Sequence, residues 1–382
     1  MSAAFDLTTS PEMLHREQSR FETAIGMAND LEFGTRRNQD RAAETEAEII
    51  AQQQDEAGNW VFDNVPDSDP SLPVNVKWAE DIAARIPTSK LGIDTINASA
   101  VNTPEQLKEV LDRAEAAGKE WAAKPAAKRA EILHRAGVIM SQRRAELIEV
   151  MASEAGKALD QGDVEVSEVV DYAHYYGETA KLLEGIPGAK FTPAKITVVT
   201  PPWNFPVAIP GGSTIAGLAA GSPVILKPAT PSRRCGAVLA ECLWEAGVPK
   251  DVLQLVKLKD HGLGQQLITD ERVERVILTG SIETAQMFRS WRPDLGLLAE
   301  TSGKNAIIVT PSADLDLAVK DVVNSAFGHA GQKCSAASLV ILVGTVGTSK
   351  RFHNQLIDMV KSLHIGYPQD LGIQMGPVVE LP

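Results

Sequence analysis

Residues 196–226 read ITVVTPPWNFPVAIPGGSTIAGLAAGSPVIL, so that two short β-rich runs enclose a segment of helical composition. Three more β-rich runs follow, each separated from the next by helical segments: Val252–Val256, Val276–Leu278 and Ala306–Val309. Short apolar strands that alternate with helices are typical of a parallel sheet covered by helices on its faces. The sequence therefore predicts an α/β fold.

Unusual sequences stand directly after several of these β-rich runs. Pro202–Pro206 follows the first run, Lys227-Pro228 the second, and Thr279–Ser281 the run that ends at Leu278. Ligands of parallel sheets bind beyond the carboxyl ends of the strands. We therefore expect these three segments to line a binding site.

Helical patterns occupy the region before the first strand. One pattern begins at Thr103, the predicted N-cap, with Pro104 in the first turn and Gln106 in the reciprocal capping position. Pro125 opens a second pattern, and residues 163–183 form a third. The apolar residues of the second pattern that we expect to point inward are Ile132, Leu133, Ala136, Ile139 and Met140.

The acidic charge is concentrated near the N-terminus. The chain carries a net charge of −13, and residues 1–75 alone hold fifteen acidic and five basic residues. Residues 12–56 predict solvated helices without a core of their own, and residues 64–73 contain three prolines, so we expect a boundary there. Such a leader repels polyanions, and no basic stripe interleaved with aromatic residues follows it. We therefore expect no nucleic-acid partner.

The three cysteines indicate a compartment. Cys235, Cys242 and Cys334 are an odd number at uneven spacing, which does not predict a disulfide framework, and a reducing cytoplasm fits them best. The first residues carry no signal-peptide pattern, and no run approaches the roughly 20 apolar residues that cross a bilayer. We expect a cytoplasmic protein with no membrane partner.

Metal binding is not expected. No Cys/His or His/Glu grouping has metal-ligand spacing. A histidine outside such a grouping is most simply a surface residue or a hydrogen-bonded polar residue. We apply this interpretation to His261, His329, His353 and His364.

Cys334 is the candidate nucleophile. A lone cysteine is commonly a small buried hydrophobe, but Cys334 lies within the stretch Gly331–Ser335. The glycine lets a substrate approach the backbone, and the adjacent cation of Lys333 helps to lower a thiol pKa. Cys235 and Cys242 stand seven positions apart on one predicted helix and keep a structural interpretation.

Five segments occur in the same order as in the aldehyde dehydrogenase superfamily, which the chain resembles over roughly residues 75–382. The 34 positions from Glu300 to Cys334 also fit that family. The resemblance implies a Rossmann-like cofactor domain at residues 76–300 and a partial α/β catalytic domain at residues 301–382, preceded by a mostly helical acidic leader at residues 1–75. The segments are Pro202–Pro206, Lys227–Ala229, Leu278–Ser281, Glu300–Asn305 and Gly331–Ser335.

The resemblance also implies a reaction, the NAD(P)-dependent oxidation of an aldehyde to a carboxylate through a cysteine thioester. In it, the Cys334 thiolate attacks the aldehyde, and the Asn204 side chain and the Cys334 backbone N–H hold the resulting oxyanion. Glu300 activates the water that hydrolyses the thioester. The resemblance assigns further residues to the cofactor, namely Pro202, Trp203, Lys227, Gly280 and Ser281. It assigns two to the substrate, Phe205 and Ser335.

Two departures from the family pattern concern the cofactor. Thr230 stands where many members carry a Glu that grips the ribose and disfavours a 2′-phosphate. Ala285 stands where many members carry a second glycine, which implies looser pyrophosphate contacts. NAD is the expected cofactor, and NADP stays open.

Within the superfamily, Glu300–Asn305, residues 280–285 and Cys334-Ser335 most resemble the L-glutamate γ-semialdehyde dehydrogenases of proline catabolism. These enzymes oxidise the open form of Δ1-pyrroline-5-carboxylate to glutamate. The leader resembles the inter-domain region of bifunctional proline utilization A proteins, which makes a proline dehydrogenase domain or protein an expected partner. The family's catalytic domain continues beyond Pro382, so the resemblance implies a C-terminally truncated chain. Three alternatives stay open: a non-catalytic nucleotide-binding remnant, a dehydrogenase for another semialdehyde, and an interaction module built on the acidic leader.

Overall fold

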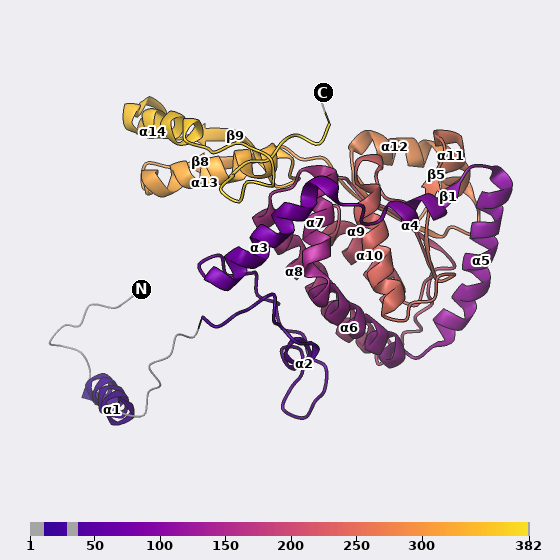
Figure 1. The fold of residues 1–382 in the computed structure, drawn as a ribbon, viewed down its shortest axis with the longest axis horizontal. Coiled ribbons are helices and arrows are strands. Elements are labelled where there is room, and N and C mark those ends of the chain that lie inside the picture. Colours follow the sequence, from indigo (N-terminus) through magenta and orange to yellow (C-terminus); the bar gives the residue numbers. More distant parts are fainter. Residues whose placement is uncertain (1–10, 29–36, 381–382) are drawn as a thin grey trace. The chain divides into compact units, whose positions relative to one another are not determined.

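The computed structural model describes residues 11–28 and 37–380 of the chain (Figure 1). It contains two compact units, Met1–Gln39 and Asp40–Pro382, and each is described by itself. In the first unit, helix α1 (Pro11–Met27) buries none of its side chains, which agrees with the expected solvated helix. No helix within the described ranges is long and apolar enough to span a membrane.

The second unit is built on a parallel sheet of five strands, in the order β4-β3-β2-β6-β7. The chain enters at the centre with β2, adds β3 and β4 on one side, and then returns to add β6 and β7 on the other side. All neighbouring strands are parallel, so the predicted α/β fold is confirmed. The strands span Thr197–Thr200 (β2), Val224–Leu226 (β3), Leu253–Leu255 (β4), Arg275–Gly280 (β6) and Leu297–Thr301 (β7).

Helices cover both faces of this sheet because its strands are apolar on both faces. Val198 and Ile225 pack into one hydrophobic cluster, whereas their neighbours Val199 and Leu226 pack into another. This alternation follows from the two-residue period of a strand. The helices that surround the sheet are α5 (Pro104–Ala123), α9 (Ala208–Ala219), α10 (Arg233–Glu245), α11 (His261–Thr269) and α12 (Ile282–Trp291). Three further helices, α6 (Ala126–Gln142), α7 (Arg144–Ala155) and α8 (Leu159–Leu183), pack on α9 and α10.

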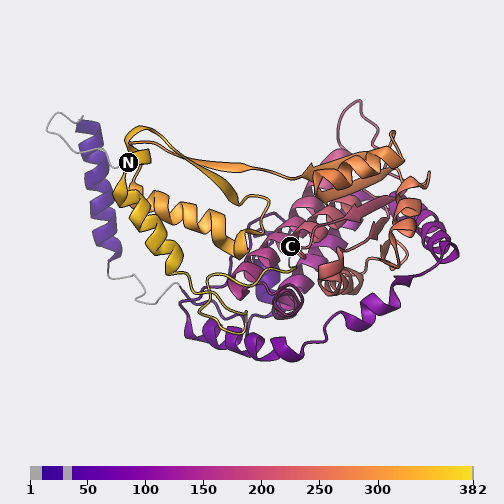
Figure 2. The same ribbon diagram turned by 90° about the horizontal axis from the view of Figure 1, so that it is seen from above.

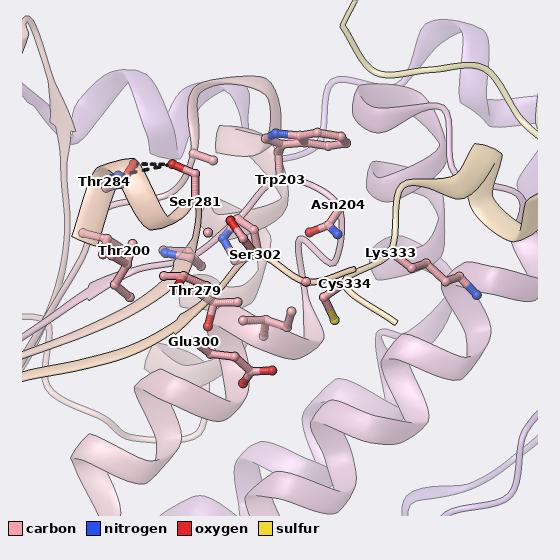
Figure 3. Close-up of a pocket in the computed structure, with 18 of the residues that line it drawn as sticks. Thr200, Trp203, Asn204, Thr279, Ser281, Thr284, Glu300, Ser302, Lys333 and Cys334 are labelled. Atoms are coloured by element: carbon pink, nitrogen blue, oxygen red, sulfur yellow. Dashed lines mark hydrogen bonds between the residues drawn. The ribbon is translucent and has the colours of Figure 1, made fainter. Parts of the chain in front are cut away.

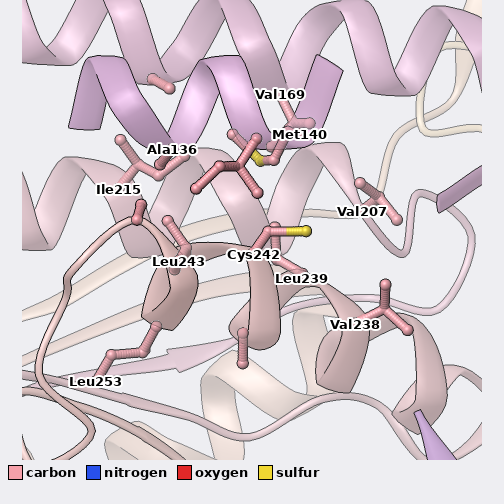
Figure 4. Packing of buried hydrophobic residues seen from close by; sticks show 14 of the residues in the cluster. Ala136, Met140, Val169, Val207, Ile215, Val238, Leu239, Cys242, Leu243 and Leu253 are labelled. Carbon is pink, nitrogen blue, oxygen red and sulfur yellow. The ribbon is translucent and has the colours of Figure 1, made fainter. Parts of the chain in front are cut away.

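The larger cluster accounts for the two helical cysteines. Cys235 and Cys242 lie on α10 with no exposed surface. Figure 4 shows Cys242 packed among apolar side chains that include Met140 and Val169. Both cysteines therefore behave as small core residues, as the sequence predicts.

Helix α5 begins where the sequence predicts, although one cap bond differs. The Thr103 side chain accepts a hydrogen bond from the N–H of Gln106 at 3.3 Å. The Gln106 side chain accepts from the N–H of Asn102 at 2.7 Å, one residue earlier than expected for a capping box. The Gln106 side chain thus binds the backbone N–H of Asn102, which lies outside the helix.

Residues 40–75 belong to the second unit and pack on its helices. Helix α2 (Glu46–Ala51) buries Ile49, and Asp171 of α8 accepts a hydrogen bond from the N–H of Val65 at 2.8 Å. Helix α3 (Pro73–Arg85) begins at the last proline of the proline-rich stretch. The division between compact units falls after Gln39, and the domain limits derived from the resemblance stay predictions.

A second, smaller layer lies beside the main sheet (Figures 1 and 2). It consists of the parallel pair β8 (Asn305–Val309) and β9 (Ala337–Leu342) with helices α13 (Leu315–Phe327) and α14 (Lys350–Lys361). Val309, Val319, Val346 and Phe352 form its core. The sequence predicts β8 but not β9.

The remaining elements are short. Helix α4 (Ile93–Ala98) precedes β1 (Ala100–Val101), which pairs in parallel with β5 (Lys257–Leu258). Along the chain, β1 lies between α4 and α5, and β5 lies between β4 and α11. It lies outside the five-stranded sheet.

Candidate active site

The segments expected to bind ligand come together around one cavity of about 880 Å³ (Figure 3). The cavity lies where the carboxyl ends of β2, β6 and β7 meet, because its lining includes Thr200, Gly280 and Thr301. Between β2 and β6 the order of strand addition reverses, which is where open α/β sheets bind their ligands. Nine of the predicted site residues line it: Pro202, Trp203, Asn204, Lys227, Gly280, Ser281, Glu300, Cys334 and Ser335.

Phe205, the tenth predicted residue, lies outside the lining. Its ring centroid is 3.8 Å from the Lys157 ammonium nitrogen, and its edge meets the His329 ring with 6.4 Å between centroids. The side chain therefore contacts Lys157 and His329 and does not line the cavity. Its assignment to the substrate stays a prediction.

Cys334 follows a backbone segment that few residue types adopt. His329 and Ala330 have φ angles of 52° and 57°, and Gly331 has a φ angle of 71°. Left-handed conformations are costly for residues other than glycine and occur most often at functional sites. Cys334 itself is exposed at the end of this segment.

Asn305 fixes the Cys334 loop to the smaller layer. Its side-chain Nδ2 donates to the backbone oxygens of Cys334 and Ala336, at 2.6 Å and 3.2 Å. Asn305 ends the motif Glu300–Asn305, but the sequence alone assigns it no role. The sequence feature that could have indicated a role is its position as the last residue of that motif, which is also the first residue of β8.

Asn204 contacts the same loop from the opposite side. Its Nδ2 donates to the backbone oxygen of Gln332 at 2.9 Å, and its Oδ1 accepts from the N–H of Phe205 at 3.1 Å. A carboxamide has two N–H donors, so this arrangement uses one and leaves the other for a ligand. Cys334 and Asn204 line the same cavity, as Figure 3 shows.

Glu300 lies on β7, opposite Thr279 of β6, and its carboxylate is exposed to the cavity. Two residues later, Ser302 has a φ angle of 42°, which is uncommon for a residue other than glycine. The Ser302 hydroxyl accepts a hydrogen bond from the N–H of Ile282 at 3.2 Å. Glu300 is therefore followed closely by a turn that contacts the start of α12.

The N-terminus of α12 is partly satisfied by the protein itself. Ser281 is the N-cap, and its hydroxyl accepts from the N–H of Thr284 at 3.2 Å. With Ser302 bonded to Ile282, two of the first three N–H groups already have acceptors. The predicted pyrophosphate region thus keeps a favourable helix dipole but offers few free donors.

Lys227 is the residue that the resemblance assigns to the cofactor side of the cavity. It follows β3 and is half-buried in the cavity wall. Burial lowers the pKa of its ammonium group, and the nearby Arg233 lowers it further. Among the described residues, the Lys227 ammonium has no hydrogen-bond or ion-pair partner, so its donors are available to a ligand.

His329 is a buried histidine rather than a surface one, and it fits the expected hydrogen-bonded alternative only in part. Its side chain is 3% exposed and is hydrogen-bonded to the backbone of Asn204, whereas its Nε2 has no partner among the described residues. Burial, together with the nearby ammonium groups of Lys157 and Lys333, lowers the pKa of His329 to about 3. The ring is therefore neutral at physiological pH.

The three cysteines differ sharply in environment, which predicts their reactivity. Burial raises the pKa of Cys235, and burial also raises the pKa of Cys242 to about 12. Cys334 is exposed. We expect iodoacetamide to label Cys334 first in the folded protein, as followed by mass spectrometry over time. Faster labelling of either α10 cysteine would argue against Cys334 as the nucleophile, and equal labelling in denaturant serves as the control.

Comparisons with known proteins agree with this geometry. The model of the aldehyde dehydrogenase family matches residues 80–381, so the chain belongs to the aldehyde dehydrogenase family and the resemblance is confirmed. The chain is 34% identical over 305 residues to a 1-pyrroline-5-carboxylate dehydrogenase of Geobacillus thermodenitrificans. That alignment covers 75% of this chain and 59% of the relative, so the chain spans little more than half of that protein's length.

Two solved structures are similar to the chain. Proline utilization A from Corynebacterium freiburgense has a TM-score of 0.78 and 40% identity, and the match covers 97% of this chain and 35% of that one. A 1-pyrroline-5-carboxylate dehydrogenase from Thermus with bound NAD has a TM-score of 0.75 and 27% identity. That match covers 84% of this chain and 70% of the Thermus chain.

Proposed function

We propose that the chain carries the nucleophile and cofactor-binding part of a dehydrogenase that oxidises an aldehyde to a carboxylate. The observation that carries this proposal is that Cys334, Asn204 and Glu300 line one cavity with Lys227 and the start of α12. A nucleophile, an oxyanion donor and a base are the groups that acyl chemistry needs. A bound nicotinamide cofactor supplies the hydride acceptor.

In the proposed mechanism, the Cys334 thiolate attacks the aldehyde carbon and produces a tetrahedral oxyanion. The free N–H of the Asn204 carboxamide and the backbone N–H of Cys334 hold that oxyanion. Loss of hydride leaves a thioester on the cysteine. Glu300 then takes a proton from water, which attacks the thioester and releases the carboxylate and the thiolate.

The proposed cofactor is NAD. The Lys227 ammonium is suited to the ribose hydroxyls, and the helix dipole at the N-terminus of α12 favours the pyrophosphate there, with few free N–H donors to bind it. The Thermus relative of similar structure is described with bound NAD, which supports this choice. Thr230 presents no carboxylate against a 2′-phosphate, so slower use of NADP is compatible with the proposal.

The proposed substrate is L-glutamate γ-semialdehyde, and the proposed context is proline catabolism in the cytoplasm. The names of the Geobacillus and Thermus relatives, both 1-pyrroline-5-carboxylate dehydrogenases, support this substrate. The match to a proline utilization A protein over 97% of this chain supports a proline dehydrogenase domain or protein as the partner. A reducing compartment suits the free Cys334 thiol.

The test is NADH formation by the chain when Δ1-pyrroline-5-carboxylate and NAD⁺ are supplied together, with glutamate measured as the product. We expect NADH and glutamate in equal amounts, and a lower rate with NADP⁺. Acetaldehyde and succinate semialdehyde serve as comparison substrates, because a preference for either would assign a different aldehyde. Binding of NAD⁺ without turnover of any aldehyde, also in a form extended to the length of the Geobacillus relative, would instead favour a non-catalytic nucleotide-binding protein.

A further inference from the structure

A fully buried ion pair lies directly behind the Asn204 loop. Lys157 stands in the connection between α7 and α8, and Glu165 stands on α8. Their side chains have 0% exposure, and the Lys157 ammonium donates to Glu165 Oε1. Neither residue lines the cavity, so neither contacts a ligand there.

The pair contacts the Asn204 loop at three backbone groups. The Lys157 ammonium donates to the backbone oxygen of Asn204 at 3.1 Å. Glu165 Oε2 accepts from the N–H groups of Val207 and Ala208, each at 3.0 Å. The Lys157 ammonium also lies over the Phe205 ring, which adds a cation–π contact. One ion pair thus fixes the backbone of residues 204–208.

Stability alone does not explain such a pair. Two charges lose their hydration on burial, and an apolar pair of similar volume is often equally stable or more stable. An apolar pair, however, would leave the backbone groups of Asn204, Val207 and Ala208 without these partners. The pair is therefore suited to hold a loop whose position matters.

The loop in turn determines where the Asn204 carboxamide lies. Its Nδ2 already contacts the backbone oxygen of Gln332, two residues before Cys334. A shift of the Asn204 backbone therefore moves the second N–H relative to the thiol. Misplacement of a catalytic group by about 1 Å can cost 10²-fold in rate.

We propose that Lys157 and Glu165 are positioning residues that act through Asn204 and hold its carboxamide where an oxyanion forms beside Cys334. This inference rests on the proposed function, because it takes Asn204 as the oxyanion donor. It adds two residues that touch neither substrate nor cofactor.

Two reagents separate oxyanion stabilisation from simple thiol reactivity. With 4-nitrophenyl acetate, the Cys334 sulfur attacks the carbonyl carbon, a tetrahedral oxyanion forms, and breakage of the C–O bond releases 4-nitrophenolate and leaves acetyl-Cys334. With iodoacetamide, the sulfur displaces iodide in one step, and no oxyanion forms. The ratio of the acylation rate to the alkylation rate therefore reports the oxyanion site, and it requires no cofactor.

The test variant is the double substitution Lys157→Met/Glu165→Gln, which removes both charges together. The glutamine oxygen can still accept from Val207 and Ala208, whereas the methionine thioether has no proton to donate to Asn204. We expect acylation to slow by about 10- to 10²-fold and alkylation to change by less than about twofold. Asn204→Ala should slow acylation by roughly 10²–10³-fold, the usual effect of removing one oxyanion donor. In the Asn204→Ala background, the pair substitution should have no further effect.

A second buried ion pair provides the matched control. Arg144 donates to Asp163 at 2.8 Å, and their side chains are 2% and 8% exposed. Arg144→Met/Asp163→Asn removes the same charges but touches no residue of the Asn204 loop, so its acylation-to-alkylation ratio should match the unmodified protein. If Lys157→Met/Glu165→Gln does not unfold cooperatively, Lys157→Gln/Glu165→Gln replaces it under the same criteria.

The outcomes distinguish the two proposals. Equal slowing of acylation and alkylation by the pair substitution, or slowing that persists in the Asn204→Ala background, would overturn the positioning role and leave the proposed function intact. No effect of Asn204→Ala on acylation would remove Asn204 as oxyanion donor, which contradicts the proposed function itself. A selective loss of acylation that disappears in the Asn204→Ala background supports both.

Discussion

Replacement of Cys334 by alanine is expected to abolish NADH formation with Δ1-pyrroline-5-carboxylate. Without the thiol, no thiohemiacetal can form, and the aldehyde hydrogen has no route to the cofactor. The expected result is no NADH above the rate of a protein-free blank. The measurement is NADH absorbance in the steady state, on the chain and on a form extended to the length of its relatives.

Loss of activity must be separated from loss of fold, and the chain offers a matched control. Cys242→Ala removes a buried thiol of α10 that lies outside the cavity, so it should keep the unmodified rate once its thermal unfolding shows an intact fold. NAD⁺ binding by Cys334→Ala, measured by calorimetry, should also be retained. Appreciable NADH formation by Cys334→Ala would exclude the thioester mechanism.

The sequence predicts the centre of the fold well because buried parallel strands are apolar at nearly every position. Residues 197–200 of β2 are all buried, and the run that predicts β3 matches Val224–Leu226. Strand β7 is different because it lies at the edge of the sheet. Its residues Leu297–Thr301 are mostly exposed and end in Glu300 and Thr301, so no apolar run reveals them.

Strand β9 was missed for a related reason. Its burial pattern leaves Leu339 and Ile341 exposed, and its only partner among the described strands is β8. The apolar run of β9 is only six residues long. Over so short a run, length and periodicity do not distinguish a strand from a segment of buried helix. The pairing with β8 is a long-range contact that local sequence does not encode.

The residues of the candidate site also differ in how well the sequence predicts them. Residues within short motifs, such as Cys334, Asn204 and Glu300, could be found because the motif fixes residue type and local backbone together. Lys157 and Glu165 could not, since a lysine and a glutamate eight positions apart usually lie on a solvated helix face. Their burial depends on α9 and the Asn204 loop packing over α8, which only the tertiary structure supplies.

Glu300→Gln should separate the two halves of the proposed reaction. If Glu300 mainly activates the hydrolytic water, thioester formation survives its replacement but hydrolysis does not. The variant should therefore release about one NADH per active site in a rapid burst and then stop. Stopped-flow absorbance of NADH resolves the burst, and mass spectrometry of the stalled protein should show Cys334 carrying the acyl group.

The shape of the time course assigns the role of Glu300. Glu271→Gln, an exposed substitution that lies outside the cavity, should turn over at the unmodified rate and controls for a change of surface charge. A full steady-state rate in Glu300→Gln would remove Glu300 from the mechanism. Absence of any burst would instead show that Glu300 acts before hydride transfer, in activation of the Cys334 thiol. Without an activated thiol no thiohemiacetal forms, so no hydride is transferred. A burst followed by a stall is the one result that requires a base acting only on the thioester.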